Sequence, residues 1–325
     1  MPAKVFITID TEEDFWDDYR SIDNPVNNID RIPVVQELFD RYGAVPTYLV
    51  TYPVLVNDHA VRIIQKINER GRCEIGSHCH PWNTPPFEKE INSHNVILCN
   101  LPYDLQCRKI NTLHEKMVER FGFSPRCFRA GRWGFGPTVA KCIHSLGYVI
   151  DTSVTPFWDW TGNHGPDFSE APTFSYRFGP NDILTEDPDG CLLEVPPTIG
   201  FLQKNFERCA RIRKMILESP FAKLRLLGVL AKLRILNFQW LTPELFNGSD
   251  MVSLSKTFIQ KEHTFLNMTF HSISLLPGRS GYIHDEYDFQ RFLKDIEIFL
   301  QFAVDSGLEF SPLSKAWDEF KSVKK

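Results

Sequence analysis

The sequence predicts an α/β protein built around a barrel of parallel strands with helices outside. Strand-like and helix-like patterns alternate regularly from residue 4 to about residue 154. A length of 325 residues is ordinary for a single barrel of this kind. Polar residues follow several of the expected strands, at the end of a barrel where active sites lie. About seven β/α units are expected, within one domain spanning 1–325.

Each element of the first half has a local reason. Runs of β-branched and aromatic residues indicate strands, whereas apolar residues at helical spacing, followed by glycine, indicate helices. The expected order is strand 4–10, helix 32–43, strand 45–52, helix 59–71, strand 73–78, helix 101–122, strand and glycine-rich loop 126–136, helix 138–147 and strand 148–154. Such alternation favours a parallel sheet.

After residue 154 the regular alternation stops. Residues 155–190 are rich in Pro, Gly and Asp and read as loop with a possible hairpin. The elements expected beyond them are strand 191–197, one or two helices in 201–235, strand 264–272, helix 286–307, and a last strand and helix within 308–320. The stretch at about 198–260 is therefore interpreted as a helical segment inserted into the barrel domain.

The composition indicates a globular protein without a membrane span. Hydrophobic residues make up 42% and charged residues 24% of the chain. No run of 18 apolar residues occurs, and the opening MPAKVFITID reads as a strand rather than a signal peptide, so a cytoplasmic location is expected. The eight cysteines are scattered and contain no CxxC pair, which argues for mostly free thiols and against a zinc ribbon.

The net charge of −5 hides one strongly basic window. Between Lys204 and Arg234 there are nine Lys or Arg residues and only two acids. The window is apolar between its charges, rather than rich in glycine or aromatic residues, so nucleic-acid binding is not expected. Residues 201–238 fit two interpretations: peripheral contact with an anionic membrane at its inner face, or a basic-rimmed cap over the barrel.

The first motif with chemical meaning is ITIDTEEDF, residues 7–15. Asp10 and Glu12 are two residues apart at a strand end, so their side chains share one side of an extended chain. One of them can bind a divalent metal while the other acts as a base. The alternative is a solvated acidic loop.

The second motif is SHCHPW, residues 77–82. His78 and His80 have the same two-residue spacing, so that two imidazoles can converge on one ion. Two neutral imidazoles and a carboxylate, with positions left for water, form a catalytic site for zinc or another transition metal. The alternative is that each histidine only hydrogen-bonds a turn.

Two further segments end in reactive groups. In FRAGRWGFG (128–136), Arg129 can keep a catalytic carboxylate ionised, or form an ordinary salt bridge. In LNMTFHS (266–272), His271 interrupts an apolar strand, and Asp151 is the expected partner that would raise its pKa and make it a general acid. A lone histidine there is alternatively a satisfied core residue.

The ordered set of segments resembles the polysaccharide deacetylases, the NodB-homology group or carbohydrate esterase family 4. The likeness covers roughly residues 4–160 and 264–320. It implies a distorted (β/α)7-type barrel that uses a divalent metal, zinc first and cobalt, nickel or manganese as alternatives, to remove acetyl groups from sugars.

The resemblance also implies roles for residues. Asp10 matches the family's base, and Glu12 replaces the metal carboxylate that normally lies next to that base. His78 matches the first metal histidine; Trp82 stands where the second normally lies, and His80 is the substitute. Arg129 resembles the arginine that braces the base, Asp151 resembles the aspartate of the family's fourth motif, and His271 resembles the histidine that protonates the leaving group. Trp82, Arg132 and Trp133 are expected to bind substrate.

The function expected from the resemblance is metal-dependent removal of an acetyl group from an N-acetylated sugar. The sugar would belong to a bacterial glycan or its precursor, such as an O-antigen or lipopolysaccharide intermediate. The altered metal spacing leaves two alternatives open. One is a metal-free amidohydrolase acting on a cyclic amide, and the other is an inactive glycan-binding barrel.

Overall fold

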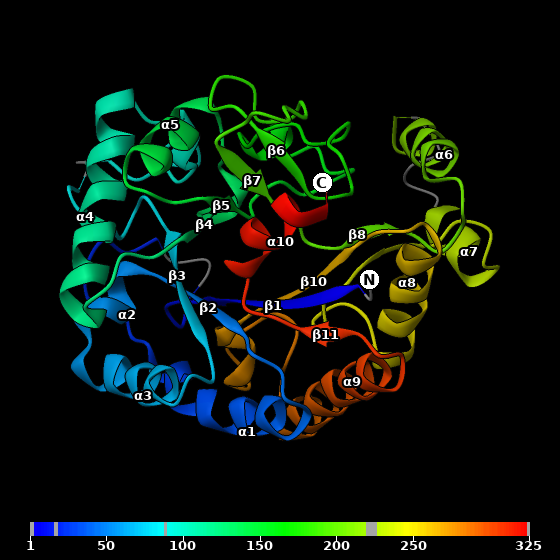
Figure 1. The fold of residues 1–325 in the computed structure, drawn as a ribbon, viewed down its shortest axis with the longest axis horizontal. Helices are drawn as coiled ribbons and strands as arrows, with labels where there is room; N and C mark the ends of the chain where they lie inside the picture. Colours follow the sequence, from blue (N-terminus) through cyan, green and yellow to red (C-terminus); the bar gives the residue numbers. More distant parts are fainter. Residues whose placement is uncertain (1–2, 16–18, 88–89, 219–225, 324–325) are drawn as a thin grey trace.

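The computed structural model describes residues 3–15, 19–87, 90–218 and 226–323 (Figure 1). Two basic residues of the window described above, Lys223 and Arg225, lie outside these ranges. The centre of the described fold is a curled sheet of nine strands in the order β10-β1-β2-β3-β4-β5-β7-β6, with β11 paired to β1. The expected α/β class and distorted barrel are therefore confirmed.

All pairings in this sheet are parallel except that of β6 with β7. The strands are β1 (Lys4–Thr11), β2 (Thr47–Val50), β3 (Glu74–Cys79), β4 (Cys127–Ala130), β5 (Ile150–Asp151), β6 (Tyr176–Phe178), β7 (Leu192–Glu194), β10 (Phe265–His271) and β11 (Glu309–Phe310). Because parallel neighbours run in one direction, their carboxyl ends meet at the same end of the barrel.

Helices lie around the outside of this sheet, except that the last of them, α10, lies over the centre of the sheet in this view (Figure 1). They are α1 (Ile32–Tyr42), α2 (Tyr52–Val56), α3 (Asp58–Glu69), α4 (Tyr103–Phe121), α5 (Pro137–Ser145), α6 (Phe206–Glu218), α7 (Leu226–Lys232), α8 (Gly248–Gln260), α9 (Glu286–Asp305) and α10 (Lys315–Val323). The sequence patterns did not predict α2 or α8. Among the described residues, no helix combines the length and the apolar character needed to cross a bilayer.

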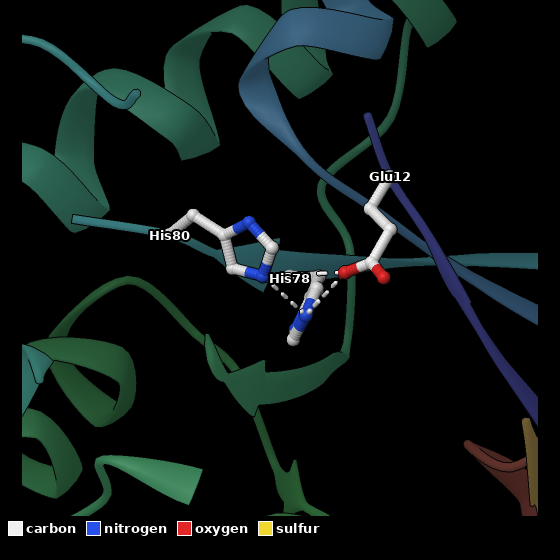
Figure 2. Close-up of side chains that lie close together, drawn as sticks. All are labelled: Glu12, His78 and His80. Carbon is white, nitrogen blue, oxygen red and sulfur yellow. Dashed lines mark hydrogen bonds and ion pairs between the residues drawn. The ribbon is translucent and has the colours of Figure 1, made fainter. Parts of the chain in front are cut away.

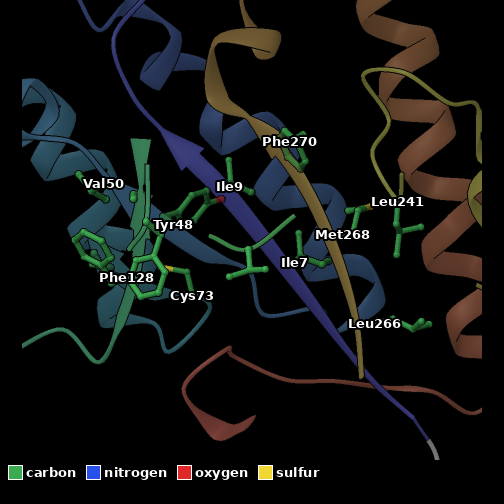
Figure 3. Close-up of a cluster of buried hydrophobic side chains, with 14 of the residues drawn as sticks. Ile7, Ile9, Tyr48, Val50, Cys73, Phe128, Leu241, Leu266, Met268 and Phe270 are labelled. Carbon is green, nitrogen blue, oxygen red and sulfur yellow. The ribbon is translucent and has the colours of Figure 1, made fainter. Parts of the chain in front are cut away.

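The main core lies between the outer face of the sheet and the helices. Ile7 and Ile9 of β1 pack with Met268 and Phe270 of β10 and with Tyr48 of β2, all of them almost completely buried (Figure 3). Successive residues of a strand point to opposite faces. The residues between these apolar ones therefore point into the barrel, and their side chains line its interior.

The interior of the barrel is apolar at the bottom and polar above. A separate cluster at the amino ends of the strands includes Phe6, Leu49, Cys127 and Ile150, and Leu313 of the C-terminal segment packs against it. The backbone N–H of Leu313 also donates to Thr47 Oγ1 at 3.1 Å, so this segment closes the bottom. The site can therefore open only at the carboxyl ends of the strands.

The stretch at about 198–260 closes the remaining side of the barrel. Its short strands β8 (Ile199–Phe201) and β9 (Phe238–Trp240) form an antiparallel pair. The N–H of Thr198 donates to the carbonyl of Asn267 at 3.0 Å, and the N–H of Thr269 donates to the carbonyl of Leu241 at 3.1 Å. These bonds tie the stretch to β10. Its interpretation as an insertion into a single domain stays a prediction.

The cysteines differ from expectation at one pair. Cys107 of α4 and Cys142 of α5 form a disulfide, with their Cα atoms 5.2 Å apart. The other six cysteines are free thiols, as the sequence predicted. The pair escaped prediction because its 35-residue separation carries no motif; the packing of α4 against α5 brings the two side chains together.

Candidate metal and acid-base centre

Strand ends bring the predicted polar residues together at the mouth of the barrel. Asp10 lies beside His271 in the pairing of β1 with β10, and His78 lies beside Arg129 in the pairing of β3 with β4. The side chains of all four residues point into the barrel. Each of them lies two residues after another inward-pointing position of the same strand, because alternate residues of a strand share a face. The alternative that the acidic run is a solvated loop is wrong, because Asp10 and Glu12 are each only 2% exposed.

Glu12, His78 and His80 form a buried three-residue cluster in which one ligand atom from each lies within 4.8 Å of the others (Figure 2). The Nε2 atoms of His78 and His80 are 2.9 Å apart. Glu12 Oε2 lies 3.5 Å from His78 Nε2 and 3.3 Å from His80 Nε2. Two imidazole nitrogens and a carboxylate are a donor set that suits zinc and similar transition metals.

The second ring nitrogen of each histidine is held by an acceptor. His78 Nδ1 lies 3.1 Å from the carbonyl oxygen of Arg129, and His80 Nδ1 lies 2.8 Å from Glu13 Oε1. Each contact favours the tautomer with its proton on Nδ1, which leaves a lone pair on Nε2. Two such lone pairs 2.9 Å apart do not attract each other, whereas a cation between them binds both. The residues therefore fit a metal ion.

The charge of the site also fits a divalent cation. Four carboxylates, those of Asp10, Glu12, Glu13 and Glu244, face two cationic groups, Arg129 and His271. With the metal-site imidazoles neutral, two negative charges are left over. Burial raises the pKa of Glu12 to about 7, while burial lowers the pKa of His78. A bound divalent cation would favour the ionised carboxylate and the neutral imidazole.

Asp10 is held by a completely buried arginine. Arg129 Nη1 lies 2.5 Å from Asp10 Oδ1, and the remaining guanidinium N–H groups donate to Thr8, Thr152 and Thr269. Burial by itself would raise the pKa of Asp10, but the charge of Arg129 and the nearby histidines lower it to about 2. Asp10 is therefore a carboxylate, as the sequence predicted, and the salt bridge that Arg129 forms with it is completely buried.

The other oxygen of Asp10 faces both histidine groups. Asp10 Oδ2 lies 3.7 Å from His78 Nε2 and 3.6 Å from His271 Nε2. It therefore stands between the three-residue cluster on one side and His271 on the other. A carboxylate in this position can exchange a proton with a group bound at either side.

The prediction that Asp151 is the partner of His271 is wrong. His271 Nδ1 instead lies 2.9 Å from Glu244 Oε2, and Glu244 also accepts from the N–H of His271 and from Ser274 Oγ. Burial alone would lower the pKa of His271, but Glu244 outweighs it and raises the pKa to about 10. No sequence signal identifies Glu244, because it lies 27 residues before His271 outside any motif.

Asp151 lies on the other side of the barrel wall. Thr152, its neighbour, contacts Arg129 inside the barrel, so the side chain of Asp151 points outward. There its oxygens accept from the N–H and Oγ of Ser153, and it lies beside Glu194 of β7. Burial raises the pKa of Glu194 well above its usual range, and the neighbouring carboxyl group of Asp151 raises it further.

The cluster opens into a cavity of about 310 Å³ with aromatic walls. Trp82, Arg132 and Trp133, the predicted substrate-binding residues, all line it, together with Trp160. This volume is at the lower end of the range for small-molecule pockets, roughly 300–1,000 Å³. Contact of these residues with a substrate stays a prediction.

Trp82 has a visible structural role as well. Its ring stacks on His80, with centroids 4.1 Å apart and planes 25° from parallel. The residue that stands where a second metal histidine is expected thus supports the histidine that replaces it. Arg132 contacts the hydroxyl of Tyr19, and its guanidinium lies 5.5 Å from the centre of the Tyr19 ring.

Gly131 is required by the position of His80. A Cβ at residue 131 would lie 2.3 Å from His80 Cδ2 and 2.9 Å from the carbonyl oxygen of Cys79. The following residues, Arg132 and Trp133, have φ of 51° and 58°. The FRAG segment therefore allows β4 to approach β3 and lets the chain turn sharply around the imidazole.

Comparison with known proteins gives a likeness in structure only. No protein-family profile matches the sequence, and no characterised protein matches it. A putative polysaccharide deacetylase from Mycobacterium smegmatis aligns at a TM-score of 0.56 and 13% identity, over 100% of this chain and 92% of that one. A putative glycoside hydrolase/deacetylase from Parabacteroides distasonis aligns at a TM-score of 0.61 and 9% identity, over 99% of this chain and 72% of that one.

At these identities the likeness concerns the fold. It extends over the whole of this chain, including the stretch at 198–260 that the sequence resemblance left out. The chain therefore has the fold of the polysaccharide deacetylases, with a buried Glu-His-His cluster at the mouth of its barrel.

Proposed function

We propose that the protein is a metal-dependent hydrolase that removes an acetyl group from an N-acetylated sugar of a bacterial glycan or of a glycan precursor. The observation that supports this most directly is the convergence of Glu12, His78 and His80 beside the buried carboxylate of Asp10. Asp10 in turn lies beside His271, so metal donors, a carboxylate and a cationic acid line one cavity.

Glu12, His78 and His80 would hold the cation. Two nitrogens and one carboxylate favour zinc, with cobalt, nickel and manganese as alternatives. When bound, such an ion acidifies water and polarises a carbonyl group. Glu13 and the carbonyl of Arg129 keep the two imidazoles oriented for this task, through the contacts at their Nδ1 atoms.

Asp10 is the base in this proposal. Its Oδ1 is held by Arg129, so Oδ2 remains directed at the cavity side of the cluster. Oδ2 would accept the proton of the water whose oxygen attacks the acetamide carbonyl carbon. A backbone N–H of the turn Gly131–Trp133, which borders the cavity, would stabilise the oxyanion that this attack creates.

His271 is the acid. Glu244 keeps the imidazole protonated, and Nε2 faces the cavity 3.6 Å from Asp10 Oδ2. When the bond between the carbonyl carbon and nitrogen breaks, Nε2 would give its proton to the departing amine. The products are acetate and an amino sugar, and a proton passes from Asp10 to His271 to restore the starting state.

The cavity indicates the size of the substrate. About 310 Å³ suits one acetamido sugar ring rather than several, and Trp133 and Trp160 offer faces on which a ring can stack. We therefore expect the reacting sugar to bind in the cavity while the rest of the glycan lies outside it.

The test combines metal analysis with acetate release from N-acetylglucosamine-containing oligosaccharides. Purified protein should bind about one zinc or similar ion per chain, and His78→Ala should abolish both metal binding and acetate release. His144→Ala, which removes an exposed histidine of α5, serves as the control and should change neither.

Three results would contradict the proposal. Acetate release by His78→Ala at the wild-type rate would exclude a role for the cluster. A metal-free protein that opens a cyclic amide would instead support the amidohydrolase, and a metal-free protein that binds glycans without hydrolysis would support the inactive barrel.

A further inference from the structure

The surface of α6, α7 and the residues after α7 carries an unusual number of exposed apolar side chains. Six of the eighteen exposed large hydrophobic residues in the described parts of the chain lie between 215 and 235. We name these six the apolar ridge: Met215, Leu217, Leu226, Val229, Leu233 and Ile235. Single exposed apolar residues are ordinary, but such a concentration marks an interaction surface.

The apolar ridge lies next to the residues that anchor α7 to the protein. Leu227 and Leu230 pack toward the core, whereas Val229 is 50% exposed and Leu233 63% exposed. Leu226, Val229 and Leu233 follow the spacing of three and four residues that puts side chains on one face of a helix. The apolar surface of α7 is therefore wider than the part that packs against the core, and the exposed part continues into Leu233 after the helix.

Exposed basic side chains lie in the same segment as the apolar ridge. Exposed Lys and Arg residues of the segment outnumber its two exposed acids, Glu207 and Glu218, by three to one. They are Lys204, Arg208, Arg211, Lys214, Lys232 and Arg234. The whole sequence has a net charge of −5, so this concentration of positive charge is local.

The combination of apolar and basic groups fits a membrane surface better than it fits a second protein. Six exposed basic residues against two exposed acids would repel a second copy of the same surface, whereas they complement anionic headgroups. A few apolar side chains at the acyl boundary, flanked by Lys and Arg over anionic headgroups, suffice for reversible binding to a bilayer.

We infer that α6 and α7 dock the protein on an anionic bilayer, with the apolar ridge in the headgroup region and the exposed basic residues over acidic lipids. The two helices contact each other and lie at the right edge of the view in Figure 1. None of the described helices can span a membrane, so the attachment is peripheral. This inference goes beyond the proposed function and does not depend on it.

Flotation with lipid vesicles tests the docking without any measurement of turnover. The full chain should float with vesicles of phosphatidylcholine containing one third phosphatidylglycerol, but not with phosphatidylcholine alone. The variant Arg208→Glu/Arg211→Glu/Lys214→Glu should bind about 100-fold more weakly. The affinity of the variant Leu226→Ser/Val229→Ser/Leu233→Ser for vesicles should fall about ten-fold or more, even when the vesicles are anionic.

Matched variants elsewhere on the surface distinguish local docking from general charge or stickiness. Val34→Ser/Val56→Ser/Val304→Ser removes exposed valines far from α7, and Arg62→Glu/Lys66→Glu/Lys141→Glu reverses exposed charges on α3 and α5. Neither should change flotation by more than about two-fold.

Three outcomes would overturn the inference. Wild-type protein that does not float with anionic vesicles contradicts it directly. An equal loss in the matched variants shows that binding is not localised to α6 and α7. A dimer in sedimentation that the Leu226, Val229 and Leu233 variant dissociates, without vesicle binding, shows that the apolar ridge contacts a second copy of the chain instead.

Discussion

Two buried groups of carboxyl side chains lie on opposite sides of the barrel wall, and they have different chemistry. Inside the mouth, Asp10 and Glu12 face cations, imidazoles and a cavity. Outside, Asp151 and Glu194 face each other and the hydrogen-bond donors of residues 153 and 154. Asp10 and Asp151 both lie at the ends of buried strands, and from the sequence both were expected to belong to the active site.

The side of the strand makes the difference. Asp10 shares the inward face of β1 with Thr8, and so it meets Arg129 and His271. Asp151 is displaced by one residue from Thr152, which occupies the equivalent inward position of its strand. A shift of one residue in a strand exchanges the core face for the other face. Position at a strand end therefore predicts a functional carboxylate only when the alternation is also known.

The largest expected effect comes from removing the positive charge of the buried Arg129 side chain. Arg129→Met leaves Asp10 buried without its partner, and we expect a loss of about 3–5 kcal/mol in the free energy of unfolding, measured with urea. Adding Asp10→Asn should restore part of this loss, since no buried charge then remains. Failure of the double variant to recover any stability would contradict the electrostatic explanation.

An exposed arginine provides the control. Arg70 pairs with Asp40 at the surface, at 2.5 Å between Nη2 and Oδ2, with Arg70 more than half exposed. Arg70→Met should cost less than about 1 kcal/mol, because surface ion pairs contribute little.

The next largest effect distinguishes Glu244, the partner of His271 in the structure, from Asp151, the partner expected from the sequence. Glu244→Gln should lower acetate release about 100-fold, whereas Asp151→Asn should lower it less than about three-fold because its side chain points away from the cavity. Equal losses of activity in the two variants would indicate that Asp151 takes part in proton transfer.

The pH dependence of the rate distinguishes the same two variants, because the direction of its shift can be predicted. The pKa of His271 is raised to about 10 beside Glu244, so its imidazolium persists through neutral pH. Without the carboxylate the pKa falls, and the imidazolium is lost at a lower pH. The alkaline limb of the rate profile of Glu244→Gln should therefore move to lower pH, while that of Asp151→Asn should stay in place.

A smaller effect is expected where β4 approaches His80. Gly131→Ala adds a Cβ that meets His80 Cδ2 at 2.3 Å, so the imidazole must move. We expect metal affinity, measured by competition with a chelator, to fall about 10–100-fold. Gly162→Ala is the matched control, since nothing lies within 4 Å of its added Cβ, and unchanged affinity in both variants would argue against the tight packing at residue 131.

The smallest effect concerns the carboxyl pair outside the barrel. Burial raises the pKa of Glu194 well above its unfolded value, so the folded state holds this proton more tightly. The resulting stability is complete below the unfolded pKa and is lost as pH rises through the folded pKa. Glu194→Gln removes that dependence, and its stability relative to wild type should increase with pH by at most about 1.4 kcal/mol per unit.

Urea unfolding at several pH values measures this change. Glu69→Gln, at an exposed position of α3, is the control and should follow the wild-type curve. A Glu194→Gln curve parallel to that of wild type would show that the folded state does not raise the pKa of Glu194.

By itself, the sequence determined the α/β class, most of the strands and helices, and the residues whose strand ends form the site. Strand ends are readable because β-branched runs stop at polar residues, and parallel strands bring those ends together. Asp10, Glu12, His78, His80, Arg129 and His271 were found in this way. Their expected roles in hydrolysis remain proposals.

Only the tertiary structure decided which partners orient these residues. Glu13 reaches His80 because β1 ends at Thr11 and the chain then leaves the strict alternation. Glu244 reaches His271 from a stretch that has no motif, and β5 is too short for its pattern to reveal which side Asp151 faces. These contacts join residues that are distant along the chain, so no local spacing encodes them, and only the closed barrel brings them within hydrogen-bonding distance.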